Sequence, residues 1–173
     1  KATAFWDGFQ AEFTTEPEAC FSYACDNLQV GLHLIYEKAI KPNPKARLTY
    51  ADVVPVDFKE MPELTPEQIV LGCMPSLNAY GEDPLQVDGA SLGIRTAGAH
   101  VHFQLPKDFS NETYRKIVKG LDRMWGVVSV AMFQGLEDGR RRQYYGRAGE
   151  YRRPTYGLEY RVPGPAMLCA PWI

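Results

Sequence analysis

The chain has 173 residues, of which 45% are hydrophobic and 23% are charged, so it is long enough to bury one ordinary core. Its eight Phe, ten Tyr and three Trp exclude a disordered chain, because such chains lack large apolar side chains. No run of about 18 uncharged apolar residues is present, so we expect no membrane partner. No basic stretch followed by an apolar segment opens the chain, so we expect no export signal.

The net charge of −2 hides an uneven distribution. Residues 139–161, the arginine-rich segment, contain seven Arg and two Glu, a local charge of +5 that leaves −7 for the rest of the chain. Guanidinium groups bind phosphates and carboxylates through two hydrogen bonds at once. The segment therefore predicts a phosphate site, a nucleic-acid surface or a solvated loop, and nucleic acid is the least favoured partner.

The cysteines predict no disulfide framework. They are Cys20, Cys25, Cys73 and Cys169, and no two of them form a Cys-x-x-Cys pair. Their neighbours are mostly apolar, so we expect buried, reduced thiols in a protein of cytosolic type.

The first half of the chain predicts a strand followed by a long helix. Apolar and polar residues alternate over residues 4–14, as in a strand with one buried face. The sequence Thr-Glu-Pro-Glu at 15–18 is typical of a helix start. The helix is expected to run to about Lys41, where Pro-Asn-Pro follows. Residues 46–58 predict a strand or hairpin, and a short helix is expected near 66–71.

The second half predicts a strand over 94–105, a helix that opens at Ser110, a loop over 134–154 and a strand over 156–162. The apolar side chains of the helix recur about every 3.6 residues. They are Tyr114, Ile117, Val118, Leu121, Met124, Trp125 and Val128. Strands separated by two amphipathic helices predict an α+β fold, most simply an antiparallel sheet with helices packed on one face.

Each of three predicted strands carries a polar pair at positions i and i+2, which share one face of a strand. The pairs are Gln10 and Glu12, His100 and His102, and Glu159 and Arg161. If the strands are neighbours, the helices cover the apolar faces and the polar pairs converge on the other, open face. Carboxylates and imidazoles suit Mg²⁺ or Mn²⁺ when phosphates complete the coordination shell. Each pair alone is more often a polar pair or ion pair at a surface, so only their convergence predicts a metal and phosphate site.

A family resemblance covers residues 7–162. The stretch Arg-Thr-Ala-Gly-Ala-His-Val-His at 95–102 resembles the Arg-Thr-Ala-Gly-Gly-His-Ile-His motif of the phage phiEco32-like COOH-NH2 ligases of type 2. These ligases belong to the superfamily of glutamine synthetase and glutamate–cysteine ligase. Stretches at 10–13, 72–80 and 145–161 agree with the family in the same order.

The resemblance implies an ATP-dependent ligase that joins a carboxylate to an amine through an acyl phosphate. Its cofactors would be ATP and Mg²⁺ or Mn²⁺. Its substrates would be a small-molecule carboxylate and an amine, or a protein or peptide acceptor, in the host cytoplasm during phage infection. Residues 1–173 would form one glutamine synthetase-like domain. The implied metal ligands are Glu12, His100 and Glu159, the nucleotide contacts are His102, Arg147 and Arg95, and the catalytic residues are Arg161 and Arg152.

The chain departs from the family pattern at several positions. An upstream Asp-Pro-Glu segment is absent, Gln10 stands where glutamine synthetases often have Glu, and Ala99 and Gln104 replace glycines. The chain also ends at Ile173, before the next helix expected in the family. Two explanations stay open. The chain is part of a longer ligase domain that is incomplete at both ends, or it is a non-catalytic virion or assembly protein that contacts other phage structural proteins.

Overall fold

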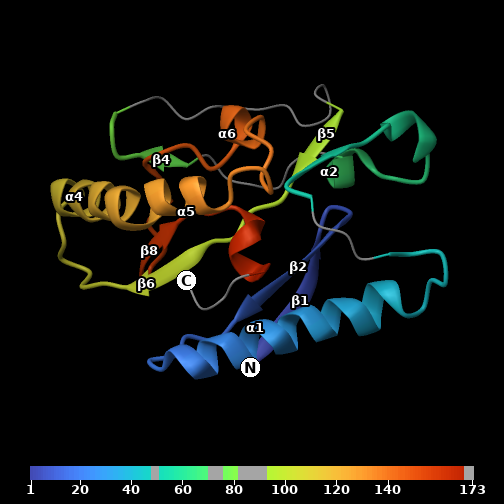
Figure 1. The fold of residues 1–173 in the computed structure, drawn as a ribbon, viewed down its shortest axis with the longest axis horizontal. Coiled ribbons are helices and arrows are strands. Elements are labelled where there is room, and N and C mark those ends of the chain that lie inside the picture. Colours follow the sequence, from blue (N-terminus) through green and yellow to red (C-terminus); the bar gives the residue numbers. More distant parts are fainter. Residues whose placement is uncertain (48–50, 70–75, 82–92, 170–173) are drawn as a thin grey trace. The chain divides into compact units, whose positions relative to one another are not determined.

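The computed structural model describes residues 1–47, 51–69, 76–81 and 93–169 (Figure 1). The chain divides into two compact units, each described by itself. Unit 1 comprises residues 1–50, 57–72 and 88–93, and unit 2 comprises residues 51–56, 73–87 and 94–173. Across the described ranges, no helix is both long and apolar enough to cross a membrane. The expectation of one domain over the whole chain stays a prediction.

Unit 1 begins with a hairpin of β1 (Ala2–Asp7) and β2 (Gln10–Thr15), in which Asp7 pairs with Gln10. The expected single strand over 4–14 is therefore wrong. Gly8 opens the turn with φ of +60°, and a positive φ at the first turn position is typical of a type II′ hairpin turn. A Cβ at this position would also lie 2.6 Å from the Gln68 carbonyl oxygen, so residue 8 must be glycine.

Helix α1 (Phe21–Ile35) follows the hairpin and continues as a π turn, η1 (Tyr36–Ile40). Its end matches the prediction, but its start does not, because Thr15 still pairs with Ala2 in the hairpin. The helix packs closely on β2: a Cβ at Gly31 would lie 2.1 Å from the Phe13 ring. Unit 1 also contains a 3-10 turn, η2 (Phe58–Glu60), and α2 (Pro66–Ile69), which confirms the expected short helix.

The main sheet of unit 2 has four antiparallel strands in the order β4-β7-β8-β6. These strands are β4 (Leu77–Asn78), β6 (Val101–Gln104), β7 (Glu150–Arg152) and β8 (Gly157–Tyr160). A second, two-stranded sheet pairs β3 (Val53–Pro55) with β5 (Ile94–Thr96). The mixture of helices and open antiparallel sheets confirms the α+β class. The helices do not cover a single sheet, however, because the described strands form three separate ones.

The expected strand over 94–105 is interrupted between β5 and β6. The Ala97 N–H donates to the Asp52 carbonyl at 2.9 Å, and the Ala99 N–H donates to the Pro163 carbonyl at 3.1 Å. A Cβ at Gly98 would lie 2.9 Å from the Arg141 guanidinium and the Tyr145 ring. The chain therefore leaves one sheet and enters the next, because the carbonyls of Asp52 and Pro163, which are distant in sequence, accept hydrogen bonds from the N–H groups between β5 and β6.

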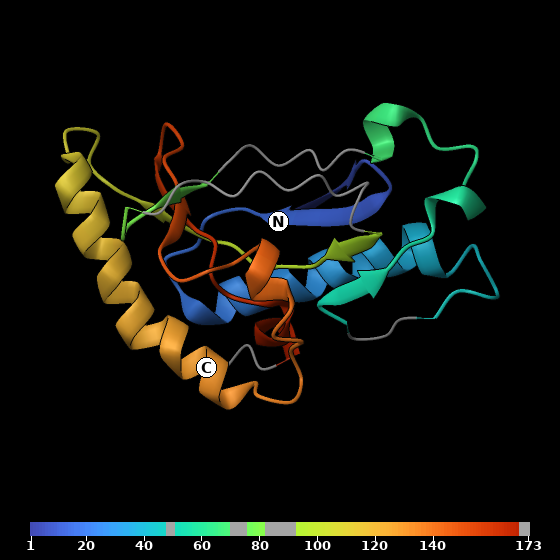
Figure 2. The same cartoon turned by 90° about the horizontal axis from the view of Figure 1, so that it is seen from above.

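The second long helix consists of α4 (Asn111–Leu121), a π turn η3 (Asp122–Gly126) and α5 (Val127–Met132), which Figure 2 shows as one continuous run. The Ser110 hydroxyl caps its start by accepting from the Thr113 N–H at 3.1 Å, as predicted. Its buried side chains pack on the apolar face of the main sheet. This core consists of Ala79, Tyr114, Val118, Tyr151, Leu158, Tyr160 and Val162.

Two members of the predicted helix stripe are exposed, Met124 by 79% and Val128 by 41%. The π turn inserts one extra residue and rotates the following positions, so Asp122 and Gly126 face inward instead. The Tyr160 hydroxyl donates to Asp122 Oδ1 at 2.7 Å, and a Cβ at Gly126 would lie 2.8 Å from that hydroxyl. A tyrosine from β8 thus decides which face of the helix is buried.

The arginine-rich segment is more ordered than the loop expected over 134–154. It contains α6 (Arg141–Tyr144) and β7, and the described chain ends in a 3-10 helix, η4 (Pro165–Cys169).

The expectation of buried thiols is wrong for Cys20, which is exposed, and for Cys25, which is only partly buried. Cys20 lies at the exposed start of α1, where its Sγ is 3.0 Å from the Ser22 hydroxyl. The side chains of Cys73 and Cys169 lie outside the described part of the chain.

Candidate functional site

The polar face of the main sheet forms a grid across three neighbouring strands. In one row His102 of β6 pairs with Glu159 of β8, which pairs with Arg152 of β7. The next row continues beyond the strand ends: the Arg161 N–H donates to the Glu150 carbonyl at 3.1 Å. His100 stands two residues before His102 and thus faces the same side. The pairs His100/His102 and Glu159/Arg161 therefore meet on one face, and Arg152 joins them.

One oxygen of Glu159 is the centre of this grid. Glu159 Oε1 lies 3.0 Å from His100 Nδ1, 2.5 Å from Arg152 Nη2 and 3.7 Å from Arg161 Nη1. Burial alone would raise the pKa of Glu159, but the hydrogen bonds from His100 and Arg152 outweigh it and lower the pKa to about 2. The carboxylate is therefore ionised at neutral pH, although only 5% of the residue is exposed.

Two tyrosine hydroxyls contact the imidazoles. The Tyr145 hydroxyl bonds His100 Nε2, and the Tyr156 hydroxyl bonds His102 Nδ1, with the Tyr156 ring stacked on His102. Burial lowers the pKa of His100, against the opposing effect of Glu159, and it also lowers the pKa of His102. Both imidazoles are therefore neutral at pH 7, the state in which histidine binds metals.

His100, His102 and Glu159 form a candidate metal site, because one ligand atom from each lies within 4.8 Å of the others. Two imidazoles and one carboxylate suit Mn²⁺ better than Mg²⁺, which prefers oxygen ligands. Two guanidinium groups lie beside the single carboxylate, so the site has an excess of positive charge. This donor set fits a cation that arrives together with phosphates better than a bare cation.

The expectation of an open, wet face is wrong for the centre of the site. Glu159 is 5% exposed and Arg161 is fully buried. The strand alternation does place them opposite the apolar core, as predicted. They are nevertheless covered, because each is engaged by side chains from the arginine-rich segment: Arg152 pairs with Glu159, and Arg161 Nη2 donates to the Tyr145 hydroxyl at 2.5 Å.

Most arginine side chains of the arginine-rich segment contact other residues of unit 2. Arg141 is fully buried and donates to the carbonyls of Ala97 at 2.7 Å and Pro163 at 2.9 Å. Arg142 pairs with Glu137 at 2.9 Å, and the exposed Arg140 pairs with Asp138. These arginines thus largely stabilise the fold. The interpretation of the segment as a nucleic-acid surface stays a prediction.

The remaining predicted site residues are Arg95, Arg147 and Glu12, and none of them stands on a strand of the grid. Arg95 is buried in β5, in the two-stranded sheet, where it stands opposite Val54. Arg147 Nε donates to Glu150 Oε1 at 2.8 Å, beside the grid. Glu12 is exposed on β2 of unit 1, opposite Phe5. The roles of these three residues in nucleotide or metal binding stay predictions.

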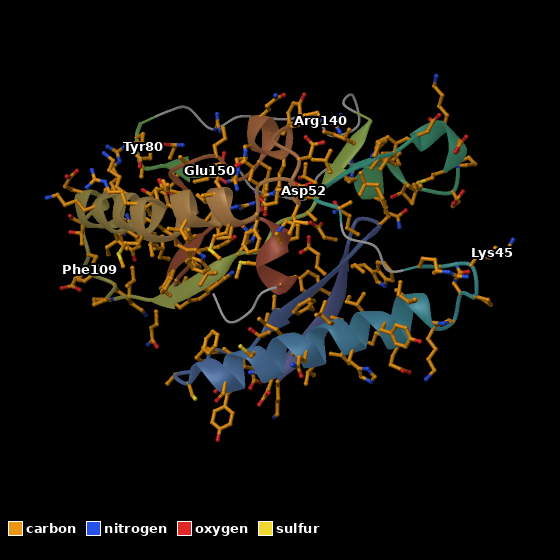
Figure 3. All side chains as sticks on the ribbon, viewed as in Figure 1. Lys45, Asp52, Tyr80, Phe109, Arg140 and Glu150 are labelled. Carbon is orange, nitrogen blue, oxygen red and sulfur yellow. The ribbon has the colours of Figure 1, made fainter. Side chains whose placement is uncertain are left out.

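The sequence interpretation missed three residues of this region, Tyr145, Tyr156 and Glu150. Of these, Glu150 is labelled in Figure 3. Glu150 is buried, and its Oε2 accepts from the Gly146 N–H at 2.9 Å, so it holds the turn that carries Arg147. The sequence contained a signal for Glu150, because Glu150 and Glu159 are the only two acidic residues among the seven arginines of the segment. In the structure each of them pairs with an arginine. No sequence spacing points to the tyrosines.

Comparison with known proteins identifies the family. The sequence model of the phage phiEco32-like COOH.NH2 ligase-type 2 family matches residues 87–173, half of the chain. This range contains His100, His102, Arg152, Glu159 and Arg161, whereas Glu12 lies before it. No curated protein and no solved structure matches the chain. On the family match, this chain belongs to the phage phiEco32-like COOH.NH2 ligase-type 2 family.

Proposed function

We propose that this chain is an ATP-dependent carboxylate–amine ligase that works through an acyl phosphate. The observation that carries the proposal is the convergence on Glu159 Oε1 of one imidazole and two guanidinium groups, within a cluster of potential metal ligands. The family name supports the class of reaction. The proposed use of ATP and of a divalent cation rests on the family resemblance, and the donor groups of the site support it.

The proposed reaction has two steps. A carboxylate oxygen attacks the γ-phosphorus of ATP, the bond from that phosphorus to the bridging oxygen breaks, and ADP leaves. The amine nitrogen then attacks the acyl carbon, phosphate leaves, and the amine loses a proton to solvent. Phosphoryl transfer needs mainly alignment and neutralisation of charge, so the residues required are cations and metal ligands held in fixed positions.

The side chains of this site can supply these requirements. Arg152 ends β7 and Arg161 directly follows the adjacent strand β8, and both would neutralise the transferred phosphoryl group. His100, His102 and Glu159 would hold a divalent cation, which when bound withdraws charge from the phosphate oxygens. Glu159 also keeps Arg152 in place through the contact of 2.5 Å, so the same carboxylate organises both the cation site and the guanidinium group.

Hydroxylamine provides a test that needs no knowledge of the natural amine, because it converts acyl phosphates to hydroxamates, which form a coloured complex with Fe³⁺. The full chain is incubated with ATP, Mn²⁺ or Mg²⁺, hydroxylamine and each member of a panel of L-amino acids. We expect hydroxamate and ADP in equal amounts with at least one acid. Glu159→Gln should reduce the rate by about 10–100-fold or more, whereas Glu112→Gln, on the exposed face of α4, should leave it unchanged.

The proposal fails if no acid yields hydroxamate and if AMP-PNP with Mn²⁺ does not raise the melting temperature. That result would favour the alternative function, a non-catalytic phage virion or assembly protein. The alternative predicts that purified phage particles contain the chain at fixed stoichiometry. The ligase proposal predicts instead that the chain is recovered free in the host cytoplasm during infection.

A further inference from the structure

Tyr145 contacts two residues of the site but has no role in the reaction proposed above. Its hydroxyl bonds His100 Nε2 and accepts from Arg161 Nη2 at 2.5 Å. These two partners lie next to the ends of neighbouring strands, His100 before β6 and Arg161 after β8. Their proposed tasks differ, because His100 would bind the cation and Arg161 would neutralise charge. One hydroxyl therefore joins the two halves of the site.

The ring of Tyr145 is held as firmly as its hydroxyl. The guanidinium carbons of Arg161 and Arg141 lie 4.9 Å and 5.4 Å from the ring centroid, within the range of cation–π contacts. A Cβ at Gly98 would lie 2.9 Å from Tyr145 Cε1, so the ring fits because residue 98 has no side chain. Such close packing from three segments restricts the hydroxyl to one position.

The direction of each hydrogen bond follows from donor and acceptor chemistry. An ionised carboxylate only accepts, so the contact of 3.0 Å between Glu159 Oε1 and His100 Nδ1 requires the proton on Nδ1. Neutral His100 then has a lone pair on Nε2, and the Tyr145 O–H must donate to it. A guanidinium only donates, so the Tyr145 oxygen accepts from Arg161.

We propose that Tyr145 is a positioning residue that controls the tautomer of His100; its importance for catalysis rests on the proposed function. When His100 is free, the Tyr145 O–H donates to Nε2 and keeps the proton on Nδ1. If His100 held a cation through Nδ1, the neutral imidazole would carry its proton on Nε2 instead, after exchange through solvent. The Tyr145 oxygen would then accept from Nε2–H, as the outer partner of a metal-bound histidine does.

A hydroxyl can serve in both states because it donates and accepts. Phenylalanine at this position would keep the ring packing between the two arginines but would leave Nε2 without a fixed partner. The Tyr145→Phe variant therefore separates the hydrogen bonds from the packing. Tyr144→Phe is its matched control, because it removes a hydroxyl from the preceding residue, outside the bridge between His100 and Arg161.

The first experiment uses ¹⁵N NMR of the imidazoles in metal-free protein. The chain has three His residues, and comparison with His100→Gln assigns the signals of His100. We expect the Nδ1–H tautomer in the wild type and in Tyr144→Phe, and a mixture of tautomers in Tyr145→Phe. An Nε2–H tautomer in the wild type overturns the inference, even if the variant does not fold. An unchanged spectrum in folded Tyr145→Phe also overturns it.

The second experiment measures binding of AMP-PNP with Mn²⁺ by calorimetry, which requires no turnover. Tyr145→Phe should weaken binding by about 10–100-fold, and Tyr144→Phe should not change it. Wild-type affinity in Tyr145→Phe would refute the positioning role and leave the proposed function intact. If the wild type binds no nucleotide, the proposed function fails, and the NMR spectra alone decide whether Tyr145 controls the tautomer.

Discussion

Replacing Arg141 with Met should destabilise unit 2 much more than replacing the adjacent Arg140 with Met. Arg141 is completely buried, and its guanidinium donates to the carbonyls of Ala97, Val162 and Pro163 at 2.7, 3.3 and 2.9 Å. Met preserves most of the length of the side chain but has no donor. The exposed Arg140 contacts Asp138, and exposed ion pairs contribute little to stability.

The expected loss of unfolding free energy depends on how many carbonyl oxygens lose their hydrogen-bond donor. Val162 O retains a bond from Arg142 Nη1 at 3.3 Å, and Pro163 O retains one from the Ala99 N–H at 3.1 Å. Of the three carbonyls, that of Ala97 is therefore the one left without its donor. An unsatisfied buried acceptor costs about 1–3 kcal/mol, which is the loss expected for Arg141→Met. The true value should lie in the lower part of this range, because burial already disfavours the charged guanidinium and lowers the pKa of Arg141.

Urea unfolding followed by circular dichroism and tryptophan fluorescence measures the difference. We expect Arg141→Met to lower the transition midpoint at an unchanged slope, and Arg140→Met to unfold like the wild type. Equal midpoints for the two variants would show that the buried hydrogen bonds of Arg141 contribute no net stability. The interruption between β5 and β6 would then need another explanation.

Two further predictions concern the same unit. The pKa of Glu159 lies at about 2 in the fold, below its ordinary value of 4.5, so this carboxylate stabilises the fold above pH 4.5 and loses that effect as the pH falls towards 2. Acid unfolding of Glu159→Gln should be less steep in this range, and parallel profiles would contradict the contacts with His100 and Arg152. A Cβ at residue 98 would lie 2.9 Å from Arg141 Nη2 and Tyr145 Cε1, so Gly98→Ala should cost about 1–3 kcal/mol. At Gly120 of α4 a Cβ meets no described atom within 4 Å, so Gly120→Ala should stabilise the fold by about 0.5–1 kcal/mol. Thermal unfolding should therefore give Gly120→Ala a higher melting temperature than Gly98→Ala, and the opposite ranking would refute this reasoning.

Several features of the site follow from local patterns in the chain. Alternation along a strand places His100 with His102 and Glu159 with Arg161, whatever surrounds them. The apolar period after Ser110 predicts the long helix and its buried residues Tyr114 and Val118. The family resemblance rests on the same local motifs, which is why it could be stated before the fold was known.

Other features depend on contacts between distant segments. The hairpin was missed although Asp7-Gly8 is a known turn signal, because the alternation on either side suggested a continuous strand. The helix register after Leu121 depends on the Tyr160 hydroxyl from β8, which bonds Asp122. The interruption at Gly98 depends on Arg141, which is more than forty residues away in sequence.

The amino-acid sequence by itself determined the α+β class, the long helix after Ser110 and the pairing of polar residues on common strand faces, since these depend on periods of a few residues. Only the tertiary structure decided that Arg141 and Arg161 are buried, that His100 and Arg152 both contact Glu159 Oε1, and that Tyr145 joins His100 to Arg161. The physical reason is that a buried charge needs partners, and which partners it finds is set by how far-apart segments pack.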